Sequence, residues 1–212
     1  MMPFQNSSSN ICLLHTNICK MYTTMKTLLT ENQTLLLRLF YTNPDKSFFI
    51  HEIGRILGKK PGVFQRTLYN LEKEGVLKSS YQANARFFQV NADHPLYPEF
   101  KKIISKTVGA SELLRQFLGK IKDARLGLIY GSFAKETERK DSDIDLLVVG
   151  HREIEGKLLR NLPAIEKSLQ REINYKLYTE NEFKKKRKAQ DPFLDEILED
   201  KYILLKGEIA DV

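Results

Sequence analysis

The sequence predicts an α+β / α/β chain of two domains, in which a small helical domain with a β-hairpin precedes a domain of alternating strands and helices. Up to residue 92, apolar residues at helical spacing are followed by two short strand-like runs. After residue 110, apolar runs of strand length alternate with helical segments, which is typical of an α/β layer. The length of 212 residues suits one large or two small domains.

The composition is that of a globular, moderately basic chain. Hydrophobic residues make up 42% and charged residues 29%, so the chain can bury a core and is not a disordered acidic tail. The 34 basic and 27 acidic residues give a net charge of +7, which favours a polyanionic partner such as DNA, RNA or a nucleotide. No window approaches the roughly 18 uncharged apolar residues that a membrane-spanning helix needs, so we expect no membrane partner.

Both cysteines stand near the start of the chain, in a segment without periodicity. Residues 1–24 carry one charge, Lys20, among Asn, Ser and Thr, and we expect them to form a disordered leader. Cys12 and Cys19 lie in this leader and the histidines are scattered, which excludes a disulfide scaffold and a Cys/His metal site. A reducing, cytoplasmic location is therefore expected.

The first domain is expected to span residues 25–92. Its elements follow the order helix 35–40, strand 47–50, helix 51–57, a third helix from residue 61, and a hairpin of strands 76–81 and 86–90. Gly58 can adopt the positive φ that ends the second helix, and Pro61 fits the first turn of the third. This order is that of a winged helix-turn-helix. A helical linker is expected to follow at residues 93–109.

The same region is strongly basic, with seven Lys and Arg against three Glu between residues 51 and 90. Gln65, Arg66 and Asn70 lie off the apolar face of the third helix and could meet a major groove. Lys60, near the start of that helix, and Arg86, on the wing, are placed to contact phosphates. This part resembles winged-helix transcription regulators, which implies binding to double-stranded DNA. A winged helix used for dimerisation or for docking a protein is the alternative.

The second domain is expected to span residues 110–212, with strands and helices in alternation. The expected order is helix 111–118, strand 126–130, short helix 133–135, strand 143–149, helix 153–170, strand 172–177, a helix over 181–188 and a short strand 202–205. In this type of layer, ligands bind at the ends of strands. The segment from Phe183 to Lys188 contains five basic residues in a row, for which we weigh a solvated face against a contact to nucleic acid or nucleotide.

One stretch of the second domain carries the chemistry. Gly131 ends an apolar strand and lets the backbone approach a phosphate, while Ser132 opens a helix whose free N–H groups favour an anion. On the next strand, Asp143 and Asp145 are two residues apart and point to the same face, whereas Ile144 points into the core. Two carboxylates on one face suit hard divalent cations, which bridge the phosphates of nucleotides.

The stretch resembles the DNA polymerase β superfamily of nucleotidyltransferases, in particular the minimal nucleotidyltransferases, whose signature is Gly-Ser, ten residues, Asp-x-Asp. The resemblance covers about residues 110–207 and implies a small mixed sheet. It also implies that Asp143 and Asp145 are catalytic and hold Mg²⁺ or Mn²⁺, and that Gly131 and Ser132 position the β- and γ-phosphates of an NTP, with ATP as the first candidate. An acceptor hydroxyl would then attack the α-phosphorus and release pyrophosphate.

Transferases of this superfamily place a third carboxylate on a neighbouring strand. The corresponding position here is Asn174, an amide that cannot act as a base. Glu172 has the same strand parity but stands two residues, roughly 6 to 7 Å, away. The third-ligand position is therefore assigned to Asn174 with Glu172 as the alternative. A nucleotide-binding domain with weak or lost transferase activity is the alternative to an active enzyme.

Three functions follow from these residues. The first is a DNA-binding nucleotidyltransferase that modifies a macromolecule or a small acceptor. The second is a transcriptional regulator whose second domain binds a nucleotide or a partner without turnover. The third, implied by the resemblance, is the antitoxin of a pair with a HEPN-type toxin, with RNA as another partner or acceptor and a homodimer as a further option.

Overall fold

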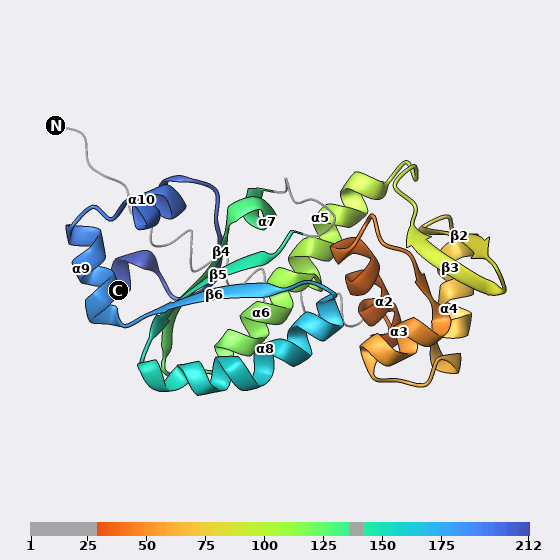
Figure 1. Ribbon diagram of the computed structural model, residues 1–212. Coiled ribbons are helices and arrows are strands. Elements are labelled where there is room, and N and C mark those ends of the chain that lie inside the picture. Colours follow the sequence, from red (N-terminus) through yellow and green to blue (C-terminus); the bar gives the residue numbers. More distant parts are fainter. Residues whose placement is uncertain (1–28, 136–141) are drawn as a thin grey trace.

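The computed structural model describes residues 29–135 and 142–212, and places two domains side by side (Figure 1). The expected leader at 1–24, with Cys12 and Cys19, lies outside the described residues. In the described parts of the chain, no helix has the length and apolar character needed to cross a membrane.

The first domain has the expected winged helix-turn-helix order. Its elements are α2 (Glu31–Thr42), β1 (Phe48–Phe49), α3 (Ile50–Leu57), α4 (Gly62–Lys73), β2 (Leu77–Gln82) and β3 (Ala85–Val90). The three strands form an antiparallel sheet in the order β1-β3-β2, so the hairpin of β2 and β3 is the wing. Gly58 ends α3 with φ of +66°, as predicted.

Local sequence signals explain where α2 begins and what the first domain buries. Thr30 caps α2 through a capping box, because its side chain accepts from the N–H of Gln33 and the Gln33 side chain accepts from the N–H of Thr30. Phe40 and Phe64 are fully buried and Leu68 almost so, which places the apolar faces of α2 and α4 against each other in one core.

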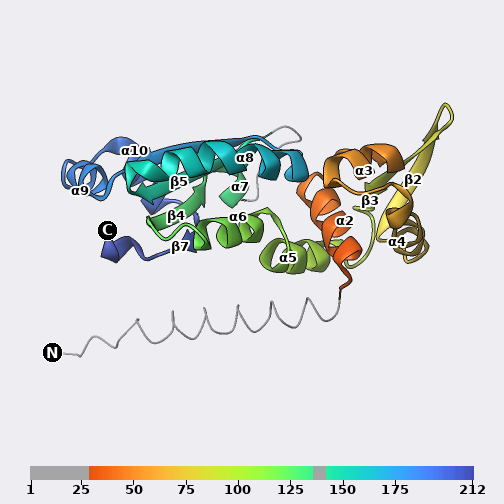
Figure 2. The same cartoon turned by 90° about the horizontal axis from the view of Figure 1, so that it is seen from below.

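The helix after the wing, α5 (Tyr97–Thr107), packs along α2 and carries the chain towards the second domain (Figures 1 and 2). Ile104 and Val108 are buried in the core of the first domain. Nε of Arg38 on α2 donates a 2.5 Å hydrogen bond to the carbonyl oxygen of Val108. This segment thus lies against the first domain and is followed at once by the first helix of the second.

The second domain is built on a four-stranded mixed sheet, as the resemblance implies. Its elements are α6 (Ala110–Gly119), β4 (Ala124–Tyr130), α7 (Gly131–Lys135), β5 (Ile144–Gly150), a 3-10 turn η1 (Arg152–Ile154), α8 (Glu155–Leu169), β6 (Ile173–Tyr178), α9 (Glu180–Lys188), α10 (Pro192–Glu199), β7 (Ile203–Lys206) and η2 (Ile209–Asp211). The strand order is β6-β5-β4-β7, and only the β5–β6 pair is parallel. The helix α10 is an element that the sequence analysis does not predict.

Helices cover both faces of this sheet, which explains the uninterrupted apolar run of β5. Ile144, Leu146 and Val148 pack with α6 and α8 on one face. Leu147 and Val149 pack with α9 and α10 on the other. Because side chains alternate along a strand, Asp145 points to the same face as Leu147 and lies at the start of the strand.

The two domains meet where α2 ends. Nδ2 of the buried Asn43 donates to the carbonyl oxygen of Leu169, the last residue of α8, at 2.7 Å. The guanidinium of Arg171, only 5% exposed, donates to the carbonyl oxygen of Thr42 from Nε and Nη2, at 3.1 and 2.9 Å. These bonds fix the first domain against the segment that leads into β6.

Candidate nucleotide and metal site

The site begins at the end of β4, where the chain turns at Gly131. This residue has φ of +73°, which strains any L side chain. A Cβ atom here would lie 2.5 Å from Oδ2 of Asp145, so any side chain would force the Asp145 carboxylate to move. Gly131 therefore sits directly against the Asp145 carboxylate. Ser132 follows in the first turn of the five-residue α7 and is half-buried.

The two aspartates stand at the start of β5. Asp143 directly precedes the strand, and Asp145 lies between Tyr130 on β4 and Asn174 on β6 in the sheet register. Burial, and then the charge of Asp143, raise the pKa of the Asp145 carboxyl. A carboxylate whose ionisation is opposed by burial and by a neighbouring negative charge is stabilised by a cation bound beside it.

Asn174 takes the position that the resemblance assigns to a third acid. It is the register neighbour of Asp145, and its Nδ2 donates a 2.9 Å hydrogen bond to Oδ2 of Asp143. Glu172 precedes β6, and its carbonyl oxygen accepts from the N–H of Ile144 at 2.9 Å. The structure therefore gathers Gly131, both aspartates and Asn174, with Glu172 at the edge of the group.

The donor set suits a hard divalent cation. The group supplies two carboxylates and one amide oxygen, and oxygen ligands are what Mg²⁺ and Mn²⁺ prefer. Within residues 29–135 and 142–212, no cluster of three His, Cys, Asp or Glu side chains could hold a metal ion. The cation would thus depend on the aspartate pair, with remaining positions left for phosphate oxygens and water.

Two further residues border the site. Lys176 lies two residues after Asn174 on the same face of β6, with Nζ 3.7 Å from the centre of the Phe193 ring. The Phe193 ring in turn meets that of Tyr130 edge-on, with centres 5.6 Å apart. Phe193 belongs to α10, so a sequence analysis that lacks this helix cannot place it. Two residues in the sequence do mark the start of α10: Asp191, which caps the helix, and Pro192, which suits its first position.

The predicted DNA-binding residues divide into two groups. Gln65, Arg66 and Asn70 are exposed on α4, and Lys60 is exposed just before it. Arg86 is engaged within the protein, because Nη2 lies 2.7 and 2.6 Å from the two carboxylate oxygens of Glu72.

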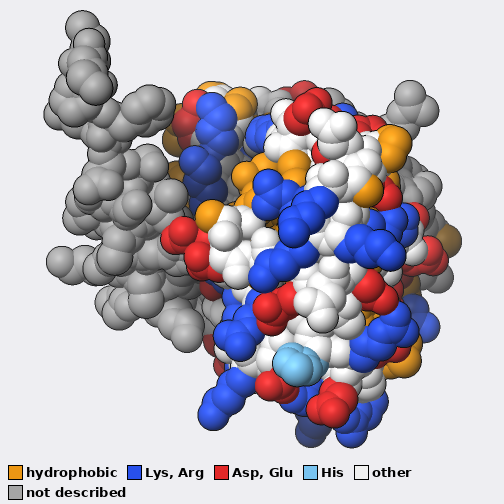
Figure 3. Space-filling view, turned by 90° about the vertical axis from the view of Figure 1, so that its left-hand side faces the viewer, with side chains coloured by type: hydrophobic (Ala, Val, Ile, Leu, Met, Phe, Trp, Pro, Cys, Tyr) orange, Lys and Arg blue, Asp and Glu red, His pale blue; other side chains and the backbone are white. Residues whose placement is uncertain are grey.

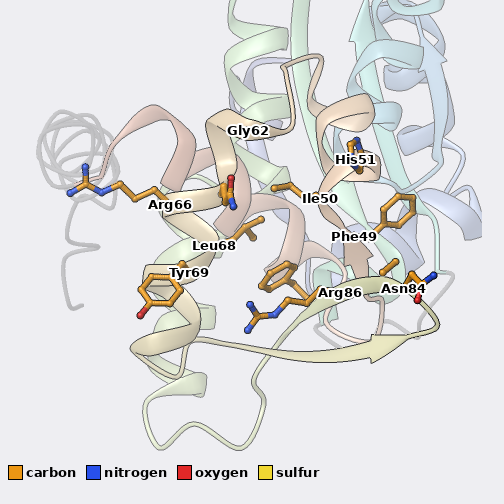
Figure 4. A pocket seen from close by; sticks show the side chains of 12 residues that line it. Phe49, Ile50, His51, Gly62, Arg66, Leu68, Tyr69, Asn84 and Arg86 are labelled. Carbon is orange, nitrogen blue, oxygen red and sulfur yellow. The ribbon is translucent and has the colours of Figure 1, made fainter.

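A pocket of about 730 Å³ lies between α3, α4 and the wing (Figure 4). Gln65 and Arg66 line it from α4, and Arg86 lines it from β3. In Figure 4 the Arg66 side chain extends away from the pocket, whereas Arg86 lies across it from α4. Three of the five predicted DNA-binding residues thus line this pocket, whereas Lys60 and Asn70 do not.

The basic run from Phe183 to Lys188 forms the C-terminal part of α9, at the opposite end of β6 from Asn174. Four residue steps along the strand, about 13 Å, lead from Asn174 to Tyr178, and α9 begins two residues later. Figure 3 views this end of the molecule, where Lys and Arg side chains stand among acidic ones. Lys186 pairs with Asp191 at 2.5 Å. This placement favours the interpretation as a solvated face over a contact to the nucleotide.

Comparison with known proteins identifies the second domain. Residues 112–208 match the family model described as polymerase beta, nucleotidyltransferase. None of the curated proteins matches the chain in sequence.

Three solved structures illustrate the structural comparison. The chain is similar to MepR, a transcription regulator of the Staphylococcus aureus multidrug efflux pump MepA, with 16% identity over 55% of this chain and 84% of that one and a TM-score of 0.35. It is similar to NadR in complex with 4-hydroxyphenylacetate, with 20% identity over 57% and 89% and a TM-score of 0.34. A toxin-antitoxin with AMP-PNP shows 16% identity over 48% and 76% and a TM-score of 0.32. The family match and the fold together identify residues 112–208 as a nucleotidyltransferase domain of the polymerase β type, which follows a winged helix-turn-helix domain in this chain.

Proposed function

We propose that the second domain transfers a nucleoside monophosphate from an NTP to an acceptor hydroxyl, and that the winged helix binds double-stranded DNA. The observation that carries the first part is the contact between Gly131 and the Asp145 carboxylate. At this contact, a turn whose glycine has no side chain, so that phosphates can approach the backbone, lies beside an aspartate pair suited to a divalent cation.

In this proposal each residue has a defined task. Asp143 and Asp145 would hold Mg²⁺ or Mn²⁺, which when bound offsets the negative charge of the phosphates and polarises the α-phosphate. Gly131 and Ser132 hold the β- and γ-phosphates, with ATP as the first NTP to test. Asn174 orients Asp143 through its hydrogen bond. The acceptor oxygen forms a bond to the α-phosphorus as the bond to pyrophosphate breaks.

The test uses the full chain with labelled ATP, CTP, GTP and UTP, Mg²⁺ and a cell lysate, and looks for a labelled protein, RNA or small product. Asp143→Asn and Asp145→Asn are expected to abolish both labelling and Mg²⁺-dependent nucleotide binding in calorimetric titration. Glu199→Gln, which changes an exposed carboxylate on α10, is the matched control and keeps both. Unchanged nucleotide affinity in both aspartate variants would overturn the proposal.

A specific observation favours a second candidate, in which the domain binds a nucleotide or a protein partner without turnover. Asn174, the register neighbour of Asp145, cannot accept a proton. Under this candidate the chain is a regulator, or the antitoxin of a HEPN-type toxin, with DNA binding by the winged helix as its output. It predicts Mg²⁺-dependent nucleotide binding in the wild type and no labelled product with any NTP.

The exposed face of α4 supports the DNA-binding part of the proposal. Gln65, Arg66 and Asn70 are exposed on this helix, away from the face that buries Phe64 and Leu68. An exposed helix with one Arg and two amide side chains can both contact phosphates and read base edges in a major groove.

A further inference from the structure

The helix α2 lies between the second domain and α4 in both views of the molecule (Figures 1 and 2). It is a regular helix of 12 residues, so about 15 Å separate Asn32 in its first turn from Thr42 at its end. Phe40 of this helix is fully buried and packs in one core with Phe64 and Leu68 of α4. Because such a core is closely packed, a displacement of α2 also displaces α4.

The C-terminal end of α2 is bonded to the backbone beside the site aspartates. Nε and Nη2 of Arg171 donate to the carbonyl oxygen of Thr42 at 3.1 and 2.9 Å, and Nη1 donates to the carbonyl oxygen of Ser142 at 2.8 Å. Ser142 directly precedes Asp143 in the chain. Arg171 stands three residues before Asn174, which bonds Oδ2 of Asp143. One buried guanidinium thus joins the end of α2 to the segments that lead into β5 and β6.

The other end of α2 is bonded to the start of α4, the helix proposed to bind DNA. Nδ2 of Asn32 donates to the carbonyl oxygen of Val63, the second residue of α4, at 3.1 Å. Arg66, one of the exposed residues proposed to contact DNA, follows one turn later. Just before α4, Nζ of Lys59 donates to Oε1 of Glu31 at 2.7 Å. The first turn of α4 is therefore held in place by the first turn of α2.

Resting on the proposed nucleotide and DNA binding, we propose that α2 couples the two sites and that Arg171 is the positioning residue that connects this helix to Asp143. Asp143 holds a cation and nucleotide best in the arrangement in which Arg171 bonds both Ser142 and Thr42. A duplex that selects one orientation of α4 selects the same arrangement, because α4 moves with α2. Each ligand therefore raises the affinity of the chain for the other, by the same factor in both directions.

The experiment measures the affinity of the full chain for a fluorescein-labelled, mixed-sequence DNA duplex by anisotropy, with and without α,β-methylene-ATP at constant Mg²⁺ and ionic strength. This analogue cannot transfer its nucleotide, because a CH₂ group replaces the oxygen that leaves with pyrophosphate. We expect the analogue to lower the Kd for the duplex by at least about fivefold. Calorimetric titration of the analogue with and without the duplex should give the same factor. An unchanged or higher Kd for the duplex overturns the inference.

Two substitutions separate coupling from stability. Arg171→Met removes the bonds at one end of α2, and Asn32→Ala, at a half-buried position, removes the bond at the other. In both variants the Kd for the duplex should no longer depend on the analogue, whereas a purely stabilising role would leave the factor at its wild-type value. Arg171→Lys keeps the charge but offers one nitrogen in place of three, so it should restore only part of the factor. Arg160→Met and Asn161→Ala, both exposed on α8, are the matched controls and should keep the factor.

Failure of the coupling can be told apart from failure of the proposed function. A wild type that binds both ligands without mutual effect overturns the coupling and leaves both binding functions standing. A factor that survives in either variant has the same consequence, and Asn32→Ala decides by itself if Arg171→Met does not fold. A chain that binds no nucleotide or no duplex overturns the proposed function, and the coupling with it.

Discussion

Arg86 and Glu72 form a two-point ion pair between the wing and the end of α4. Nη2 of Arg86 lies 2.7 Å from Oε1 and 2.6 Å from Oε2 of Glu72, and Nε donates to Oγ of Ser79 at 3.0 Å. Arg86, which the sequence analysis places at a phosphate, is thus paired with a carboxylate of its own domain. Arg66, exposed on α4, has no such counterpart among the ion pairs of the described residues.

This difference predicts unequal salt dependence of DNA binding. Arg66→Ala should weaken binding to all duplexes and reduce the slope of log affinity against log salt by about 0.9. Arg86→Ala should change that slope much less, because Glu72 already offsets its charge. Fluorescence anisotropy of the full chain on duplex DNA at several salt concentrations measures both. Lys122→Ala, an exposed base in the second domain, is the control, and equal losses of slope for Arg66 and Arg86 would contradict the prediction.

Gly131→Ala tests the contact that supports the nucleotide site. The new Cβ would meet Oδ2 of Asp145 at 2.5 Å, and φ of +73° adds strain of about 1–2 kcal/mol. We expect Mg²⁺-dependent ATP binding to be lost in calorimetric titration, with a modest fall in Tm. Gly156→Ala is the control, because it lies in α8 with no atom near the added Cβ and should be neutral or stabilising. Normal ATP affinity in Gly131→Ala would show that phosphates do not approach here.

Asn174→Asp should strengthen cation binding. The substitution adds a third carboxylate beside Asp143 and Asp145, and hard cations gain affinity with each anionic ligand. Titration with Mn²⁺ should therefore show a lower Kd than in the wild type. Asn161→Asp makes the same chemical change on the exposed side of α8 and should leave the Kd unaltered. An unchanged Kd in Asn174→Asp would remove residue 174 from the cation site.

The capping box of α9 predicts a feature of acid unfolding. Hydrogen bonds from the N–H and side chain of Thr179, and from Arg152, lower the pKa of Glu182 from 4.5 to about 2. Because the folded pKa is the lower one, the stabilisation is present above pH 4.5 and is lost as the pH falls towards 2. Glu182→Gln keeps an acceptor for the cap but no charge. As the pH is lowered from 4.5 to 2, the urea concentration at the midpoint of unfolding should fall less steeply for this variant than for the wild type. Equal slopes would mean that the Glu182 carboxylate does not contribute to the acid sensitivity of folding.

Arg171→Met tests the domain junction. The substitution leaves the carbonyl oxygens of Thr42 and Ser142 without their donors, at about 1–3 kcal/mol for each group that stays buried. Urea unfolding of the full chain should show a lower free energy of unfolding. Arg160→Met, on the exposed face of α8, removes the same charge and should change it by no more than about 0.5 kcal/mol. Equal effects of the two substitutions would mean that the junction contributes little.

Local signals carried the sequence analysis furthest. Gly58 and Pro61 fix the turn between α3 and α4 by their own backbone preferences, so the winged-helix order follows from a few residues. The motif from Gly131 to Asp145 is equally local. Gly131 directly follows β4, and Asp145 lies near the start of β5, the next strand in the chain. Glycine conformation and strand parity are properties that a sequence displays directly.

Contacts between distant segments could not be predicted in this way. Arg171 bonds Thr42, 129 positions earlier in the chain, and no spacing rule joins the two. Glu72 and Arg86 become partners only when the wing folds back on α4. The distance of α9 from Asp143 and Asp145 depends on the parallel direction of β5 and β6, which hydrophobic patterns do not specify.

The bond from Arg171 to the end of α2 also bears on protein engineering. Exchanging the first domain for another DNA-binding domain at the linker would treat the two halves of the chain as independent of each other. Here a cut after residue 109 would remove the Thr42 acceptor of Arg171 and the Lys46 side chain that donates to the carbonyl oxygen of Gln170. A chimera that keeps these bonds must carry over the segment 42–46 in its native geometry, so the part of the chain that supports the second domain does not end at the boundary between the two folds.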